Sequence, residues 1–325
     1  MSRSPVSERL SSLAILLALV SPMACGGLEH EYEPPPETFG ETKSAGGSAP
    51  QPGEVGPHAG PSTTTVSQVI VDCERHIRAW QHARANANTQ RELEQLQVLH
   101  EAFAYYVVNE MDLIREVALI GEPRARGVAS TSLGFSGDPS VLAILLNNVG
   151  DPDGDIVANT LFGLGMLAAP ETPGRSLNEA VRRPDATLEM IRNGAFAASR
   201  VAQARSKDEE RGQRKDDLDQ ALLFLMDRPE AGVRAQAASG LGYAMAENAL
   251  PQLTNLLAGD PDATVRLAAA FALGEIGKSE SGSVLISGLD DPNPGVAGAS
   301  RGALAKLFGR DNGPDPKAWE PLLRD

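Results

Sequence analysis

Cysteines, basic residues and strand-forming segments are all scarce in this chain of 325 residues. Each shortage excludes a class of fold or of binding partner. Only two cysteines are present, Cys25 and Cys73, so no network of disulfides can hold the fold. The net charge is −14 and no stripe of lysine or arginine stands out, which argues against binding nucleic acid or an anionic membrane surface directly. Strand signals are nearly absent, so we expect an all-α protein.

What the chain has instead is a repeated helical pattern. Its copies begin at Ala125, Ile156, Ile191, Val233, Val265 and Val296. The starts are 31, 35, 42, 32 and 31 residues apart. A self-similar period of this length predicts an α-solenoid, in which antiparallel helix pairs stack because one pair cannot bury its own apolar face.

Each copy has two predicted helices, here called A and B. The A helices are rich in alanine, glycine and serine, which let neighbouring helices approach closely. An X-Pro pair precedes each A helix, as in Asp151-Pro152 and Asp260-Pro261. We expect the proline to occupy the first helical position and the aspartate before it to cap the helix. Shorter B helices follow.

The segment Asp260-Pro261-Asp262 through Val265-Arg266 to Leu273-Gly274 resembles the HEAT-like repeats of the phycobilisome-lyase type. The resemblance is close over 228–308 and looser over 122–203, where residue 157 is valine rather than arginine. It implies a helical superhelix. It also implies a protein-interaction scaffold, because most members of this family are scaffolds and a few are enzymes.

The N-terminus predicts export. Residues 1–24 read as a signal peptide, with Arg3 and Arg9 before a ten-residue apolar stretch that is too short to span a bilayer. The Ala24-Cys25-Gly26 sequence that follows resembles a bacterial lipoprotein signal, which implies acylation of Cys25. Residues 25–62 are rich in proline and glycine and predict a disordered, lipid-attached linker. An ordinary secreted protein with a free cysteine is the alternative.

Caps are expected at both ends of the solenoid. Two long amphipathic helices within 63–121 predict an N-terminal helical cap, with Thr89 and Glu92 forming a capping box. The repeats then occupy 122–310. Residues 311–325 predict a C-terminal cap, in which Trp319, Leu322 and Leu323 cover the last apolar face. Cys73 lies on an apolar helix stripe and is expected to be buried and inert.

Four arginines share one place in the repeat and have two interpretations. They are Arg126, Arg192, Arg234 and Arg266. As a functional row they would bind anions. As a structural ladder they would hydrogen-bond carboxylates and loop carbonyl groups between stacked units. Their recurrence in step with the fold favours the ladder.

A second row is expected on the B helices. The position two residues after the first core residue of each B helix faces away from the core. The residues at that position are Ile144, Glu179, Phe224, Asn255 and Ser287. We expect this row to line the partner-binding groove. Exposed Ile144 and Phe224 would mark an interaction site, whereas a shift in helical register would bury them.

No catalytic or metal-binding constellation emerges. His100-Glu101 is the one His-Glu pair of the predicted folded region, whereas the di-iron hydroxylases among HEAT-like proteins carry several. We therefore expect neither a cofactor nor a metal. The sequence predicts an exported scaffold that binds an unknown protein, is anchored by its lipid in the outer membrane, and faces the periplasm or the cell surface. An enzyme of the bilin-lyase or hydroxylase kind is the alternative.

Overall fold

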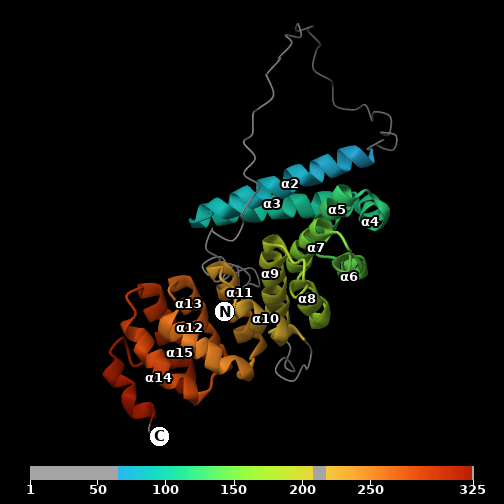
Figure 1. The fold of residues 1–325 in the computed structure, drawn as a ribbon. Helices are drawn as coiled ribbons and strands as arrows, with labels where there is room; N and C mark the ends of the chain where they lie inside the picture. The colour runs from blue at the N-terminus through green and yellow to red at the C-terminus, as the bar shows by residue number, and fades with distance from the viewer. Residues whose placement is uncertain (1–64, 208–216, 324–325) are drawn as a thin grey trace, which may run out of the picture.

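The computed structural model describes residues 65–207 and 217–323, and these form two layers of stacked helices (Figure 1). The A layer contains α5 (Pro123–Phe135), α7 (Gly154–Leu167), α9 (Leu188–Arg205), α11 (Ala231–Ala244), α13 (Ala263–Ile276) and α15 (Pro294–Phe308). The B layer contains α4 (Met111–Ile120), α6 (Leu142–Val149), α8 (Gly174–Val181), α10 (Leu218–Met226), α12 (Leu250–Gly259) and α14 (Gly282–Ser287). The predicted all-α solenoid is confirmed.

Small residues bring the A helices into backbone contact, as their composition predicts. A Cβ atom added to Gly163 of α7 would lie 2.4 Å from the carbonyl oxygen of Ser130 in α5. One added to Gly242 of α11 would lie 2.6 Å from the Cα of Ala272 in α13. Neither position has room for a side chain, so alanine and glycine set the spacing of the repeats.

The N-terminal helices cover more of the molecule than an end cap does. The first two, α2 (Val66–Asn86) and α3 (Gln90–Asn109), form a hairpin that lies across the A layer (Figure 1). The Trp80 ring packs on Phe135 of α5 and Phe162 of α7, and the Arg84 guanidinium lies 5.0 Å from the ring of Phe196 in α9. The hairpin therefore touches three repeats. The predicted capping box at the start of α3 is present.

The turn before most A helices differs from the expectation. In α7 the N-cap is Asp153, whose carboxylate accepts from a backbone N–H group inside the helix, and Pro152 lies one residue before the cap. Asp262 caps α13 in the same way, with Pro261 before it. α5 places its proline, Pro123, at the first helical position, and α15 begins with Pro294, two residues after the proline of the Asp291-Pro292 pair. The aspartates that precede Pro152 and Pro261 are thereby free for another role, described below.

At the C-terminal end, Trp319 is fully buried beside Phe308, and its indole N–H donates to the carbonyl oxygen of Gly313 at 2.8 Å. Leu322 is half-buried, and the side chain of Leu323 lies against Gly282 of α14, the last B helix, although 42% of Leu323 is exposed. No helix of the described segments is long and apolar enough to cross a membrane. The predicted signal peptide and linker, with Cys25, lie outside the described residues.

Candidate functional site: the arginine ladder and the B-helix surface

Two arginines of successive A helices make the same set of contacts. Arg266 of α13 donates to both carboxylate oxygens of Asp291, at 2.7 and 3.0 Å, and to the carbonyl oxygen of Asp260 at 2.9 Å. Arg234 of α11 binds the Asp260 carboxylate in the same bidentate way and donates to the carbonyl oxygen of Arg228 at 3.0 Å. Each guanidinium thus joins the turn before its own helix to the turn before the next one, through charge-assisted hydrogen bonds.

The aspartates of this ladder also hold their own turns in shape. Asp291 accepts a hydrogen bond from the backbone N–H of Asn293 at 2.8 Å, and Asp260 accepts one from Asp262 at 2.9 Å. Hydrogen bonds from Arg266 lower the pKa of Asp291, and the same pair raises the pKa of Arg266. Both side chains therefore remain charged at neutral pH.

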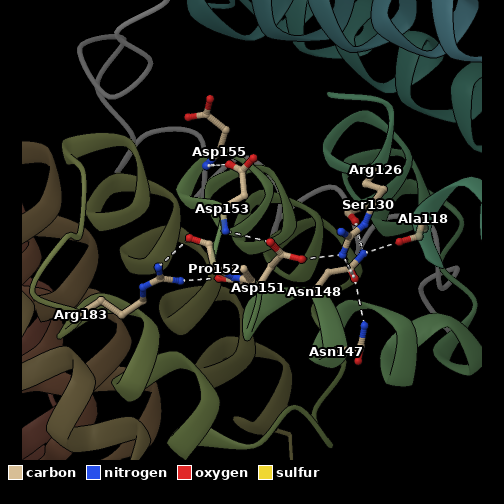
Figure 2. A network of polar contacts seen from close by, with 10 residues as sticks. All are labelled: Ala118, Arg126, Ser130, Asn147, Asn148, Asp151, Pro152, Asp153, Asp155 and Arg183. Atoms are coloured by element: carbon tan, nitrogen blue, oxygen red, sulfur yellow. Dashed lines mark hydrogen bonds and ion pairs between the residues drawn. The ribbon is translucent and has the colours of Figure 1, made fainter. Parts of the chain in front are cut away.

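We call each arginine–aspartate contact between successive A-helix turns a rung of the ladder. The first rung, between α5 and the turn before α7, extends into a buried network of hydrogen bonds (Figure 2). Arg126 of α5 donates to Asp151 at 2.6 Å and to the side-chain oxygen of Asn148 at 3.3 Å. Asn148 is fully buried, and its amide nitrogen donates to the carbonyl oxygen of Ala118 and the hydroxyl of Ser130, at 2.8 and 2.9 Å. The amide ties α6 to α4 and α5. Sequence reasoning missed it, although two adjacent asparagines, Asn147 and Asn148, at the end of an apolar helix were the available signal.

The second rung is built from a different residue. Val157 stands where α5, α9, α11 and α13 carry an arginine. Arg183, from the turn before α9, reaches back and donates to the carbonyl oxygens of Asp151 and Pro152, at 2.6 and 3.2 Å (Figure 2). It also binds both carboxylate oxygens of Asp185, at 2.9 and 2.7 Å. Its guanidinium thus has the ligands that Arg234 and Arg266 have, and only the origin of the side chain differs.

The prediction for Arg192 was wrong. This α9 residue is half-buried, and its guanidinium makes no hydrogen bond or ion pair with the residues that the structure describes. The reason lies in the next turn. Residue 228 occupies the place of Asp260 and Asp291, two residues before the helix cap, and it is an arginine. Of the four predicted members, Arg126, Arg234 and Arg266 form rungs.

The predicted row on the B helices is only partly exposed. Glu179, Asn255 and Ser287 are exposed, as expected. Ile144 and Phe224 are half-buried and pack against the hydrophobic core, which corrects the expectation that the whole row faces solvent. Neither residue is fully buried, so a complete shift in register is wrong as well. Whether this row binds a partner stays a prediction.

Arginines cover the ring of Phe224. The guanidinium carbon of Arg182 lies 4.5 Å from the ring centroid and that of Arg228 lies 5.7 Å away. Arg182 is exposed and Arg228 is half-buried. Cation–π contacts of this kind leave an aromatic ring with one edge in the core and a cationic cover at the surface.

A shallow hollow of about 390 Å³ lies nearby between α6 and α8, lined by Leu146, Asp151, Glu179 and Arg183 among others. Asp151 and Arg183 are held by the ladder contacts, so the polar part of this hollow is rigid. Glu179 pairs with Arg175 at its exposed rim.

His100 of the His-Glu pair lies on α3, on the side that faces α5. Its ring packs against Phe135 at 5.4 Å between centroids, and burial together with the charge of Arg200 lowers its pKa. Within the described segments, no group of three or more histidine, cysteine, aspartate or glutamate side chains is placed to hold a metal ion.

Stacked helix pairs joined turn to turn by arginine–aspartate rungs define an α-solenoid of the HEAT and armadillo kind. A family model described as HEAT repeats matches residues 218–305, so this part of the chain is a HEAT-repeat array. The search of curated proteins found no match.

Three solved structures are similar to the chain. Human deoxyhypusine hydroxylase in complex with glycerol is 21% identical, with a TM-score of 0.36 over 75% of this chain and 95% of that chain. The complex of CpcE and CpcF of phycocyanin lyase from Nostoc sp. PCC7120 is 16% identical, with a TM-score of 0.33 over 79% and 91%. A designed armadillo repeat protein is 18% identical, with a TM-score of 0.42 over 75% and 100%.

Proposed function

We propose that this chain is an exported, lipid-anchored HEAT-repeat scaffold that binds a protein partner on its B-helix surface. The observation that carries the proposal is the different use of the two layers. The A layer is closed by backbone contacts and by the α2–α3 hairpin, whereas α8, α10 and α12 keep polar residues at the surface around a half-buried Phe224. Export and anchoring rest on the lipoprotein-like sequence at Cys25.

Partner capture from envelope extract tests the binding proposal. Phe224→Ala removes the ring beneath Arg182 and is expected to lower capture of a specific partner at least tenfold, with a cooperative melting transition retained. Tyr105→Ala is the matched control, because Tyr105 is 72% exposed on the hairpin and lies outside the B layer. Equal capture by wild type and Phe224→Ala would contradict the proposed surface.

Metal content and the absorption spectrum of the purified full chain separate the scaffold from the enzyme alternative. We expect neither stoichiometric iron nor a bound chromophore. Either one would contradict the proposal and favour an enzyme of the hydroxylase or bilin-lyase kind.

A further inference from the structure

The ladder has one junction without its acid. In the turns before α7, α13 and α15, the residue two positions before the helix cap is Asp151, Asp260 or Asp291, and each carboxylate receives an arginine from the preceding A helix. The cap of α11 is Glu230, so the corresponding residue is Arg228. At the α9–α11 junction, arginines therefore occupy both of the repeat positions that hold an arginine and an aspartate in the rungs at Arg234 and Arg266.

Backbone contacts confirm that residue 228 has this place. Arg234 donates to the carbonyl oxygen of Arg228 at 3.0 Å, as Arg266 donates to the carbonyl oxygen of Asp260 at 2.9 Å. The turn is therefore built like its neighbours, and the difference is confined to the side chain of Arg228. In α9, Arg192 follows Ile191 as Arg234 and Arg266 follow their valines.

Neither arginine is paired by a hydrogen bond with a carboxylate of the described residues, although the charge of Arg192 acts on Glu189 of the same helix and opposes the rise of the Glu189 pKa. Within the described segments, the guanidinium groups of Arg192 and Arg228 take part in no hydrogen bond or ion pair, and the Nε of Arg228 is buried without an acceptor. Asp227 instead accepts from Gln252, at 3.4 Å. One carboxylate oxygen of Glu230 is also buried without a donor. Among the described residues, the two arginines of this junction therefore lack the carboxylate that the other rungs have, and Arg228 lies beside Phe224.

We propose that the Arg192–Arg228 junction binds a carboxylate of a partner protein, an aspartate or glutamate side chain that takes the place of the missing ladder aspartate. The same frame holds a carboxylate bidentately at Arg234 and at Arg266, which identifies the anion that fits. The half-buried ring of Phe224 beside it favours an apolar residue next to the acid in the partner. This inference rests on the proposed function and adds the chemistry of the partner.

A small probe tests the site without the partner. In the full chain labelled with ¹⁵N-arginine, N-acetyl-aspartate amide is expected to shift the Nε signals of Arg192 and Arg228 in a saturable way. N-acetyl-asparagine amide, its uncharged counterpart, is expected to leave them unchanged. Equal responses to the two compounds, or stronger saturable binding of inorganic phosphate, would overturn the proposal of a carboxylate site.

Restoring the missing acid is the second test. Arg228→Asp is expected to close the rung with Arg192, to raise the melting temperature by about 2–4 °C and to abolish the response to the probe. A lower melting temperature would mean that residue 228 does not face Arg192, and would overturn the proposal. Arg182→Asp is the control, because Arg182 is exposed and outside the rung, and it is expected to give no such rise.

The two proposals fail in different ways. If wild type and Arg228→Asp capture the same envelope partner equally well, the proposed carboxylate site is contradicted and the proposed scaffold function is not. Binding of N-acetyl-aspartate amide at the junction without any specific partner in the extract would leave the site and remove the scaffold function.

Discussion

Arg183 donates to the carbonyl oxygen of Asp151 from a turn 32 residues further along the chain, and so completes a rung that α7 cannot supply. The turns fix the oxygen atoms that accept hydrogen bonds from the guanidinium group, so this group occupies the same place in each rung. The arginine that carries it can belong either to an A helix or to the turn before the next A helix. The ladder is therefore defined by where its charges lie, and only secondarily by which residues in the repeat carry them.

Removing this guanidinium measures its contribution to stability. Arg183→Ala breaks the bonds to two carbonyl groups and to Asp185, and is expected to lower the free energy of unfolding by about 1–3 kcal/mol. Urea denaturation provides the measurement. Arg175→Ala is the control, because the Arg175–Glu179 pair is exposed and its loss is expected to leave stability nearly unchanged.

The tight spacing of the A helices predicts the effect of added bulk. Ala269 of α13 is fully buried, and Ala269→Leu is expected to overpack the interface and cost about 1–3 kcal/mol. Thermal melting would reveal this as a lower transition temperature. Ala258→Leu, at an exposed position of α12, is expected to leave the transition nearly unchanged. An unchanged transition for Ala269→Leu would mean that this interface tolerates repacking.

Acid is expected to weaken the Arg266–Asp291 rung. Because Arg266 lowers the pKa of Asp291 below its usual 3.8, this carboxylate contributes stability that is fully present above the unfolded-state pKa. That contribution is lost as pH falls through the folded-state pKa, below 3.8. Unfolding free energies of wild type and Asp291→Asn, measured from pH 6 to pH 2.5, are expected to converge at the acidic end. A constant difference would contradict the assignment.

Burial is expected to make the thiol of Cys73 unreactive in the native protein. The thiol is fully buried, and desolvation raises its pKa to about 11, so it is protonated at pH 8. In a Cys25→Ser variant, where Cys73 is the remaining thiol, a chromogenic disulfide reagent is expected to react quickly in urea and very slowly with the native protein. Fast reaction of the native protein would indicate local opening of the α2–α3 hairpin.

Cys25 is predicted to carry the lipid. Cys25→Ser is expected to move the protein from the membrane fraction to the soluble fraction, and mass spectrometry of the wild type is expected to find acyl groups at this residue. A wild-type protein that is already soluble and carries no lipid mass would contradict the proposed anchor and leave the solenoid unaffected.

The sequence was most informative where one physical requirement repeats. Close helix packing requires small residues at fixed intervals, so residues such as Gly163, Gly242 and Ala269 allowed the layer of A helices to be predicted from the sequence. The aspartates that bind Arg126, Arg234 and Arg266 were harder to predict from the sequence. Each aspartate lies in the following repeat, and a hydrogen bond between repeats produces no short, recognisable spacing in the sequence.

Exceptions to the repeat could not be predicted from the repeat. The place of Arg192 in the repeat predicts an arginine of the ladder. The residue expected to bind it is an arginine as well, Arg228, and this is seen only when the turns before the A helices are aligned with one another. Arg183 reads as an ordinary residue before a proline, since its reach back to Asp151 depends on the distance between turns. The path of the α2–α3 hairpin was equally hidden, because a helix stripe fixes which face is buried and not what covers it.

The hairpin has a mechanical consequence for the solenoid. In a stack where each repeat touches only its neighbours, bending is the sum of small independent rotations. Trp80 and Arg84 contact α5, α7 and α9 together, so rotations among these three helices are coupled and the N-terminal half moves as one piece. From α11 onward no residue of the hairpin is in ring contact, and the missing rung at Arg228 lies at the border. We therefore expect changes in the curvature of the solenoid to be larger in its C-terminal half, which the hairpin does not tie together.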